Sequence, residues 1–552
     1  MHRIARKAIR FSLILASVAG LISGAGLALL LTGAHGSLSD IVTGNRAAAI
    51  TIADRSVSQP LHLAYQTAEA AISVDTGHSI AQVDPAYLSF ALDAAQVTGA
   101  PWWDPAANKI EANAGTVAGP VFNFRQPLLD LLAGALAPAY FRIGGSEADR
   151  VWYAIKANAA PIPAGYTSIL TRNQWDEANQ FAIRNGLQIV FTLNAGPGPR
   201  QRGIWNSENA QDLIDYTNSR HYPVAVWEYG NELNGYWFIH GIGSTIPPEV
   251  YAKELGWLSQ MVHGRQPSAL VAGQGSAFWP VLGEPFSAVA GFMDAYLKAV
   301  AKPDMVKPDI IMWHYYPQQS RRSPVATRRA APGRLLNPPA LDEAGFWANK
   351  VMAWAGRSAP TASVWLGETG NAQFGGEPGV SDRWIGSLWW LDQLGLLAGS
   401  GIKVMIRQTL VGMDYGLLDE KTLTPRPDYW VSLLWKRLMG RAVYAPAASP
   451  ASPKTLRVYA HSPGPMAPPG ATVALVLVNL DPVRSTTVRL PVPMAQAWFL
   501  NAPDVLGKDL WLNGSPLKIE KKSNQASLPQ LKPVETGNLV LLQPLSVVFL
   551  VW

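Results

Sequence analysis

Short apolar runs alternate with helical patterns through the middle of the chain, and this alternation limits the possible folds more than any other feature. Eight runs have strand-like composition: 88–93, 139–145, 187–196, 224–232, 269–275, 309–316, 363–370 and 403–410. Several are continuously apolar, as expected for parallel strands covered on both faces. Helix candidates lie between most of them: 173–185, 208–219, 248–262, 287–300, 342–356 and 382–398. The pattern predicts an α/β chain with a (β/α)₈ TIM barrel over 81–440, whose first unit is least regular because 94–125 has loop-like composition.

A change of character after residue 440 marks a second domain. The stretch "APAASPASPK" (445–454) is a junction rich in Pro, Ala and Ser, and short strand-like runs with turn residues between them follow it. This pattern predicts a β-sandwich over 441–552. Residues 60–76 are also partly strand-like, so the segment 37–80 is predicted to join the sandwich in part and to add an N-terminal strand to it.

The first residues of the chain have the pattern of a targeting segment. Basic residues at positions 3, 6, 7 and 10 precede an uncharged run from 11 to 34. A helix of that length, at about 1.5 Å per residue, spans the ~30 Å hydrocarbon core of a membrane. We expect 1–36 to be an export signal, either cleaved or kept as a membrane anchor. The remainder is then expected to be periplasmic, extracellular or anchored to the outer side of the inner membrane.

Composition excludes several classes of protein. With 48% hydrophobic and 15% charged residues, the chain builds large cores and is not disordered. The absence of Cys excludes disulfides and thiol catalysis. No HExxH spacing and no GxGxxG after a strand is present, so neither a metal nor another cofactor is expected. The net charge of +6 favours an acidic partner, and the lack of a nucleic-acid-binding motif makes an acidic glycan a better candidate than nucleic acid.

Two of the eight strand-like runs end in a glutamate. Glu232 closes the fourth run and Glu368 closes the seventh. A TIM barrel gathers its active site at the carboxyl ends of its strands. Two carboxylates that face each other there suit glycoside hydrolysis, in which one donates a proton and the other attacks the sugar or activates water. Asn231, beside the first glutamate, is then expected to hydrogen-bond a sugar hydroxyl.

Longer motifs strengthen this reading. They include "FRIGGSEAD" (141–149), "WEYGNE" (227–232), "WHYY" (313–316), "VWLGETGNAQFGG" (364–376) and "VMIRQTLVGMDYGLLDE" (404–420). Together they resemble heparanase and its glycoside hydrolase family, which includes β-glucuronidases and belongs to the clan of retaining (β/α)₈ glycosidases. The resemblance covers roughly residues 80 to 552. An exported chain without Cys fits a bacterial member of the family better than an animal one.

The resemblance implies roles for individual residues. It makes Glu232 the acid/base and Glu368 the nucleophile. The further residues that it places around the sugar are Asp93, Gly145, Ser146, Asn231, Tyr316 and Tyr415, the last of which lies in the segment that holds the uronate carboxylate. The sequence departs from the family at Leu233, where Pro is common, at Ser146, which replaces Thr, and at Met413, which stands where the animal enzyme has Gly.

For other polar residues near the predicted strand ends, a structural role competes with a role in the site. Glu228 is expected to be structural, buried and hydrogen-bonded. His314 either orients the nucleophile or is a satisfied core histidine, and Arg407 is either structural or part of the site. Arginines in the loops after the third and sixth strands are either polyanion ligands or a solvated basic surface: Arg200, Arg202, Arg321, Arg322, Arg328 and Arg329.

The sequence thus predicts an exported, retaining β-glucuronidase of the heparanase type. Its expected substrate is an acidic, uronic-acid-containing glycan such as heparan sulfate, cleaved internally. Two alternatives remain open: an exo-acting β-glucuronidase of the same family, and a cell-surface glycan-binding protein without catalytic activity.

Overall fold

The computed structural model describes residues 70–103, 116–156, 161–324, 327–449, 453–522 and 525–552. The predicted export signal or anchor, 1–36, lies outside these residues, as does most of the segment 37–80. Within the described ranges, no helix has both the length and the apolar character needed to cross a membrane.

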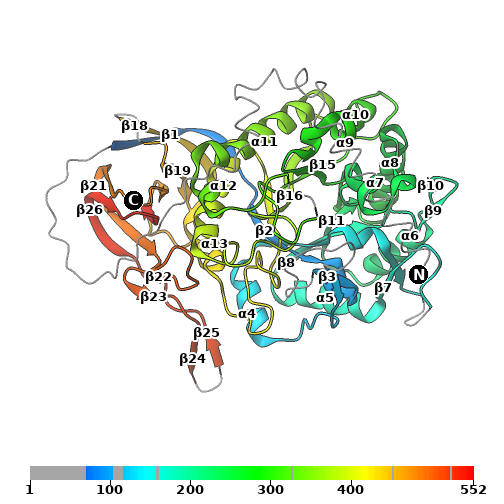
Figure 1. Ribbon diagram of the computed structural model, residues 1–552, viewed down its shortest axis with the longest axis horizontal. Helices are drawn as coiled ribbons and strands as arrows, with labels where there is room; N and C mark the ends of the chain where they lie inside the picture. The colour runs from blue at the N-terminus through cyan, green and yellow to red at the C-terminus, as the bar shows by residue number, and fades with distance from the viewer. Residues whose placement is uncertain (1–69, 104–115, 157–160, 325–326, 450–452, 523–524) are drawn as a thin grey trace. The chain divides into compact units, whose positions relative to one another are not determined.

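Eight parallel strands close into a barrel, as predicted (Figure 1). In chain order they are β2 (Leu88–Asp93), β5 (Ala139–Gly144), β8 (Leu187–Leu193), β11 (Val224–Tyr229), β12 (Leu270–Ala272), β15 (Ile310–Tyr315), β16 (Ser363–Thr369) and β17 (Val404–Arg407). The ring closes where β17 pairs with β2 and where Ala272 of β12 pairs with Ile310 of β15. The hairpin of β13 (Ser276–Trp279) and β14 (Leu282–Gly283) extends the sheet beside β15.

Helices connect the strands and cover the outside of the barrel. They include α4 (Pro127–Ala135), α5 (Arg172–Arg184), α6 (Glu208–Ser219), α8 (Pro248–Arg265), α10 (Met293–Val300), α11 (Pro338–Ser358), α12 (Trp384–Gly399) and α13 (Pro427–Leu438). Local sequence sets their ends: Thr171 and Gln174 form a capping box that starts α5. The predicted helix 287–300 is instead two helices, α9 (Ser287–Ala290) and α10, that are separated at Gly291. The predicted loop 94–125 contains α3 (Ala94–Thr98), β3 (Pro101–Trp103) and β4 (Thr116–Ala118).

The barrel interior changes from apolar to polar along the strands. Its apolar layers are formed by Ala91, Tyr140, Val190, Val226, Ala272, Ile310, Met312, Trp365, Val404 and Ile406. Side chains two positions further along a strand point to the same side. That step leads from Tyr140 to Arg142, from Val226 to Glu228 and from Met312 to His314. The strand period therefore stacks a buried polar layer directly above the apolar one, at the carboxyl ends of the strands.

The C-terminal domain is one folded antiparallel sheet that includes a strand from before the barrel. β1 (Ala70–Gln82) pairs antiparallel with β18 (Met439–Ser449) and parallel with the start of β21 (Thr486–Asn501). The sheet continues through β19 (Leu456–Pro463), β20 (Ala474–Asn479) and β27 (Ser546–Val551), with β22 (Trp511–Leu512) and β23 (Ser515–Pro516) at its edge and β26 (Val534–Leu542) beside β21. The prediction that an N-terminal strand joins the C-terminal strands is confirmed.

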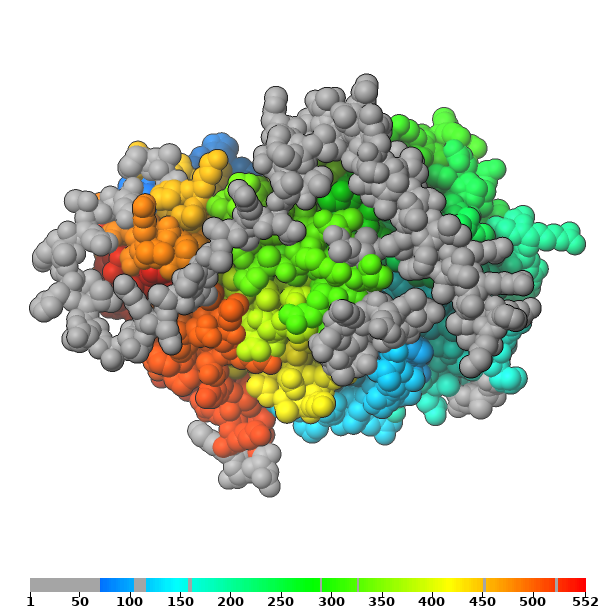
Figure 2. Space-filling view, in the orientation of Figure 1, coloured from blue at the N-terminus to red at the C-terminus, as the bar shows by residue number. Residues whose placement is uncertain are grey.

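The long strand β21 gives this sheet two layers. Its first part pairs with β1 and β26, and its second part, Gln496–Leu500, pairs with β27. The aliphatic side chains enclosed between the layers include Ile72, Leu475, Val488, Val540 and Val548. A small hairpin, β24 (Glu520–Lys522) with β25 (Gln525–Ser527), projects from the lower edge of the molecule in Figures 1 and 2.

Candidate active site

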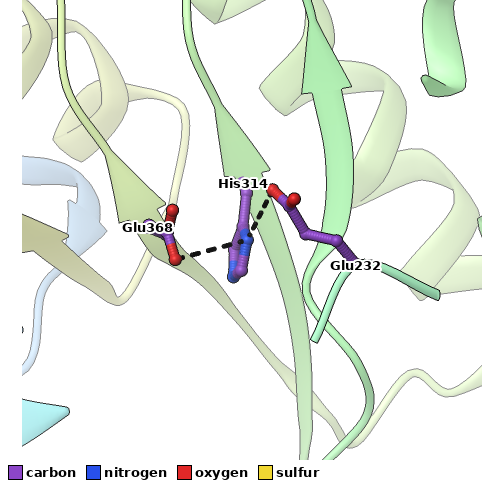
Figure 3. A group of neighbouring side chains, drawn as sticks. All are labelled: Glu232, His314 and Glu368. Atoms are coloured by element: carbon purple, nitrogen blue, oxygen red, sulfur yellow. Dashed lines mark hydrogen bonds and ion pairs between the residues drawn. The ribbon is translucent and has the colours of Figure 1, made fainter. Parts of the chain in front are cut away.

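Two glutamates meet at the carboxyl ends of the barrel strands. Glu368 lies on β16, and Glu232 follows the end of β11 in the left-handed conformation, with φ 53° and ψ 50°. One carboxylate oxygen of each, together with one ring nitrogen of His314, forms a group whose atoms all lie within 4.8 Å of one another. Figure 3 shows His314 between the two carboxylates. Both glutamates are buried, with 6% of the surface of Glu232 and 8% of that of Glu368 exposed.

Glu232 sits in a setting that favours its protonated form. Its Oε1 accepts a hydrogen bond from Trp279 Nε1 at 3.2 Å and lies 3.1 Å from His314 Nδ1. Burial raises the pKa of the Glu232 carboxyl well above its ordinary value, and the nearby charge of Glu368 raises it further. The hydrogen bond from Trp279 and the positive charge of the more distant Arg142 oppose this rise only in part. The carboxyl group is therefore suited to hold a proton near neutral pH.

Glu368 has the opposite environment. Arg142 Nη1 donates to its Oε2 at 2.9 Å, and the Tyr316 hydroxyl donates to its Oε1 at 2.7 Å. A cation and a hydroxyl that both donate to a carboxylate stabilise its ionised form. The two glutamates are therefore chemically different, one suited to give a proton and the other suited to act as an anion.

Arg142, on β5, links both glutamates to the barrel interior. Its Nε donates to Glu228 Oε2 at 2.8 Å, and its Nη2 donates to Asn231 Oδ1 at 2.9 Å. Arg142 belongs to the motif 141–149, and no role was predicted for it from the sequence. The signal was present, because an arginine inside a run of strand residues is buried only where carboxylates surround it.

Three polar residues with open readings are now placed. Glu228 is fully buried and paired with Arg142 and with the Thr192 hydroxyl, which confirms the structural reading. His314 contacts the acid candidate Glu232 at 3.1 Å and is 3.9 Å from the nucleophile candidate Glu368, so it lies nearer to the acid candidate than expected. Arg407 pairs with Asp428 at 2.6 Å and lies over two Trp rings, while its buried Nε and Nη1 have no hydrogen-bond partner among the described residues, so both of its readings stay open.

Asp93 and Gly145 lie together at one side of the site. Asp93 ends β2 and caps α3, and burial raises its pKa to about 7, with Glu368 and Glu147 contributing. A Cβ at Gly145 would come within 2.3 Å of Asp93 Oδ2, and φ there is +95°, so only glycine fits. Ser146 follows as the first residue of the short helix η1 (Ser146–Arg150) and is half-buried.

Asn231 and Leu233 flank the acid and are both held in place. The Asn231 backbone N–H donates to Asp149 Oδ2 at 2.9 Å. The Leu233 backbone N–H donates to Gln274 Oε1 at 3.2 Å. A proline at position 233 has no N–H and could not make this bond. The departure from the family pattern at Leu233 therefore has a local structural use.

Tyr316 and Tyr415 enclose the chain just after the nucleophile candidate. A Cβ built on Gly370 would lie 3.2 Å from Tyr316 Cε1 and 3.3 Å from Tyr415 Cδ1. Both tyrosines are buried in one cluster with Trp102 and Met413. Met413 has φ 53°, a backbone conformation that glycine adopts more easily than other residues. This loop therefore keeps a glycine-like conformation although methionine stands where the animal enzyme has glycine.

The arginines predicted to bind a polyanion differ in availability. Arg200 is held by Glu254, with Nη1 to Oε1 at 2.9 Å and Nη2 to Oε2 at 2.7 Å, so its guanidinium fixes the loop. Arg202 is exposed and has no protein partner among the described residues. Arg321 is half exposed and gives its Nε to Glu377 at 2.6 Å. Three others bind protein groups: Arg322, Arg328 and Arg329.

A metal ion is poorly suited to the group of Glu232, His314 and Glu368. Its three donor atoms are close enough to approach one ion. However, Arg142 Nη1 already lies 2.9 Å from Glu368 Oε2 and places a fixed positive charge beside that position. The chemistry of the donor set therefore suits a pair of carboxyl groups in unequal environments better than it suits a metal ion.

Comparison with known proteins agrees with this geometry. Residues 69–395 match the N-terminal domain of glycosyl hydrolase family 79. Heparanase-like protein 1 of Arabidopsis thaliana is 31% identical over 448 residues, which cover 77% of this chain and 76% of the relative. Heparanase of Mus musculus is 29% identical over 533 residues, covering 86% of this chain and 91% of the relative.

A solved structure supports the fold alone. The family 51 α-L-arabinofuranosidase AbfB from Bifidobacterium longum superposes with a TM-score of 0.60 at 15% identity, over 88% of this chain and 100% of that one. Its barrel and β-domain match the architecture described above. Family match and relatives together identify the protein: the chain belongs to glycosyl hydrolase family 79 and is a glycoside hydrolase of the heparanase type.

Proposed function

We propose that the protein is a retaining β-glucuronidase that cleaves acidic, uronic-acid-containing glycans, most simply by endo action on heparan sulfate-like chains. The observation that carries this proposal is the pair of glutamates with oxygens inside one 4.8 Å group. Retaining glycosidases hold their two carboxyl groups about 5–5.5 Å apart, whereas inverting enzymes need roughly 6.5–9.5 Å to admit a water molecule.

The unequal environments assign the two roles. Protonated Glu232 gives its proton to the glycosidic oxygen as the bond from that oxygen to the anomeric carbon breaks. The Glu368 carboxylate forms a bond to the same carbon and gives a glycosyl ester. Glu232, now ionised, then takes a proton from water as the water oxygen bonds to the anomeric carbon and the ester bond breaks. Both glutamates return to their starting protonation states, and the anomeric configuration is retained.

The choice of an acidic substrate rests on charge and on relatives. Arg202 and Arg321 follow the carboxyl ends of the third and sixth strands and have N–H groups not taken by protein partners in the described part of the chain. Guanidinium groups match carboxylate and sulfate geometry. Two similar proteins carry the name heparanase or heparanase-like protein, which supports a glucuronide as the cleaved unit.

Export is part of the proposal, because extracellular glycans are the substrate class named. The basic residues before the uncharged run 11–34 support an export signal or anchor. Cell fractionation of a C-terminally tagged full chain tests it. Recovery of the protein in the cytoplasmic fraction alone would refute this part.

A two-step assay tests the activity. Release of the aryl group from a chromogenic β-glucuronide by the wild type, and its loss in Glu368→Gln, is expected. ¹H NMR of the first sugar released should show the β-anomer before mutarotation. Sizing the products from heparan sulfate then separates endo action, which gives oligosaccharides, from exo action, which gives monosaccharide.

Two results would count against the proposal. An α-anomer as first product would exclude retention. Binding of heparan sulfate without hydrolysis of any glucuronide would instead favour a glycan-binding protein without catalytic activity.

A further inference from the structure

The indole N–H of Trp279 and a ring nitrogen of His314 both lie within hydrogen-bond distance of the same oxygen of Glu232. We infer that His314 and Trp279 are positioning residues that keep Oε1 of Glu232 as a hydrogen-bond acceptor, so that the catalytic proton is carried by Oε2. This inference rests on the proposed role of Glu232 as the acid and goes beyond it by naming the oxygen that acts. It also assigns a function to Trp279, which sequence reasoning did not single out.

The hydrogen bonds of Glu232 are one-sided. Trp279 Nε1 lies 3.2 Å from Oε1 and His314 Nδ1 lies 3.1 Å from the same atom. Oε2 has no hydrogen-bond partner among the described residues. It is also not among the polar atoms of these residues that are fully buried without a partner, so it retains some contact with solvent. The indole N–H can only donate, so Oε1 must accept at least one hydrogen bond. The arrangement leaves Oε2 without a protein donor or acceptor in the described part of the chain and in contact with solvent.

The tautomer of His314 decides the position of the proton. If Nδ1 carries the hydrogen, it donates to Oε1, and only a lone pair on Nε2 is left without a partner. If Nε2 carries the hydrogen, a buried N–H has no acceptor, since Glu228 Oε1 is 4.0 Å away. Orphaned buried N–H groups are rarer than under-satisfied acceptors. The Nδ1–H tautomer is therefore favoured, and it makes both contacts of Oε1 donors.

Neutral donors suit an acid better than charged ones. The charged or titratable groups around Glu232 are Glu368, Glu228, Arg142 and His314 itself. Burial lowers the pKa of His314 well below its ordinary value, and Arg142 lowers it further, so the imidazole is neutral. An imidazolium at 3.1 Å would hold Glu232 ionised, whereas a neutral ring fixes the carboxyl group and leaves its proton in place.

Neighbouring backbone holds both donors in place. A Cβ at Gly275 would come within 1.9 Å of His314 Nε2, so glycine is needed beside the ring. Trp279 is the last residue of β13. Asn234, two residues after Glu232, joins this strand to the chain around Glu232: its side-chain amide donates to Ala277 O at 3.0 Å and accepts from Ala277 N at 2.9 Å. Acid and donors therefore belong to one rigid unit.

The positions of the atoms define the proton's path. The proton leaves Oε2 for the glycosidic oxygen in the first step, and Oε2 receives a proton from water in the second step. Throughout, Oε1 keeps its two hydrogen bonds, which stabilise the carboxylate that exists between the steps. The two oxygens of Glu232 thus have separate tasks.

The decisive experiment is ¹⁵N NMR of the full-length protein with labelled histidine rings, with the His314 signals assigned by their loss in His314→Asn. We expect shifts of the neutral Nδ1–H tautomer from about pH 5 to 8. The Nε2–H tautomer, or a protonated ring, would overturn the inference. Because this readout needs no turnover, it decides the arrangement even if the wild type proves inactive on glucuronides, a result that would refute the proposed function alone.

Kinetics provide a second test that a merely structural role would not pass. Trp279→Phe and His314→Phe each remove one N–H. We expect kcat/KM, which reports the first step, to fall about 10- to 100-fold on glucuronides with poor leaving groups, which need the acid, and less than about threefold on 2,4-dinitrophenyl glucuronide, which does not. His314→Asn keeps an N–H near the position of Nδ1 and should recover most of the loss.

Matched substitutions at exposed positions serve as controls. Trp257→Phe, at a residue 47% exposed on α8, should leave the rates unchanged. His78→Phe, on β1, should do the same, because its side chain is 89% exposed. Equal losses on both classes of leaving group in the Trp279 and His314 variants would contradict the inference.

Discussion

Arg142 and Glu228 form a completely buried ion pair, with Nε of the arginine 2.8 Å from Oε2 of the glutamate. The same guanidinium gives its Nη1 to Glu368 at 2.9 Å. Glu228 thereby fixes the cation that in turn fixes the nucleophile candidate. Glu228, in the polar layer above the apolar layer of the barrel interior, thus contributes both to the fold and to the candidate site.

Replacing this cation should harm stability and activity together. Arg142→Met leaves Glu228 as an uncompensated buried carboxylate, which costs about 3–5 kcal/mol of unfolding free energy. Adding Glu228→Gln should restore most of the stability but not the activity, because Glu368 still lacks its cation. Urea denaturation and kcat/KM on an aryl glucuronide measure the two effects. Recovery of activity in the double variant would show that Arg142 has no role beyond folding.

Tyr316 should affect the reaction without affecting the fold. Its hydroxyl donates to Glu368 Oε1 at 2.7 Å, and a hydrogen bond to a charged group contributes about 1.5–3 kcal/mol. We expect Tyr316→Phe to lower kcat roughly 10- to 100-fold, while the same loss of a hydrogen bond lowers the melting temperature by only about a few degrees in a chain of this size. An unchanged kcat would mean that Arg142 alone is sufficient to orient the nucleophile.

Glu232 should impose an alkaline limit on activity. Its carboxyl must be protonated to act, and burial followed by the charge of Glu368 raises its pKa well above the ordinary value. The rate should therefore fall as pH rises through this raised pKa. In Glu232→Ala this limb should vanish, and sodium azide should restore turnover of an activated aryl glucuronide by giving a β-glucuronosyl azide. Formation of the α-azide would contradict double displacement.

Glu284 offers a test of pH-dependent stability away from the chemistry. Its Oε1 accepts hydrogen bonds from Ser276 Oγ and from the backbone N–H groups of Phe292 and Met293, yet burial raises its pKa to about 7. The folded state binds the proton more tightly than the unfolded chain, whose glutamates titrate near 4.3. Its stabilising contribution is therefore complete below about pH 4 and is lost as pH rises toward 7.

Glu284→Gln should reduce that pH dependence, because the amide keeps the accepting oxygen and cannot ionise. The measurement is the free energy of unfolding in urea between pH 5 and 8. Glu249→Gln, at an exposed glutamate on α8, is the matched control and should leave the slope as in the wild type. A slope identical in Glu284→Gln and the wild type would show that Glu284 is ionised throughout.

The loop arginines should separate into two groups. Arg202→Ala and Arg321→Ala should weaken binding of heparan sulfate up to about fivefold each, less at high salt, and leave hydrolysis of a small aryl glucuronide unchanged. Arg321→Ala should also lower the melting temperature, because it removes the ion pair to the buried Glu377. Arg200→Ala should instead lower the melting temperature, because it leaves the buried Glu254 unpaired. Titration calorimetry with heparan sulfate and thermal unfolding distinguish the groups. Equal binding by all three variants would exclude a polyanion role for these loops.

The sequence was most informative where a local rule decides structure. Continuous apolar runs identify buried parallel strands, so all eight barrel strands were predictable within a few residues. A carboxylate at the end of such a run is costly without a function, so Glu232 and Glu368 were identifiable as candidates.

Long-range pairing was not readable from the sequence. No local sequence pattern shows that Glu254, on α8, forms an ion pair with Arg200. The pairing of Arg142 with Glu228 on another strand is equally invisible in the sequence. The proximity of His314 to Glu232 likewise depends on the register between strands that are far apart in the chain. Such contacts are fixed only when the barrel closes, and motif composition alone cannot specify them.

The pairing of β1 with β18 has a consequence for synthesis on the ribosome. Strand β1 ends at Gln82, whereas β18 begins at Met439 and β27 ends at Val551. At typical translation rates, β1 waits on the order of tens of seconds for its neighbour. The barrel residues are therefore synthesised while β1, on their N-terminal side, still lacks its partner strand. Chaperones or a translocation channel would protect this unpaired strand from pairing with other chains.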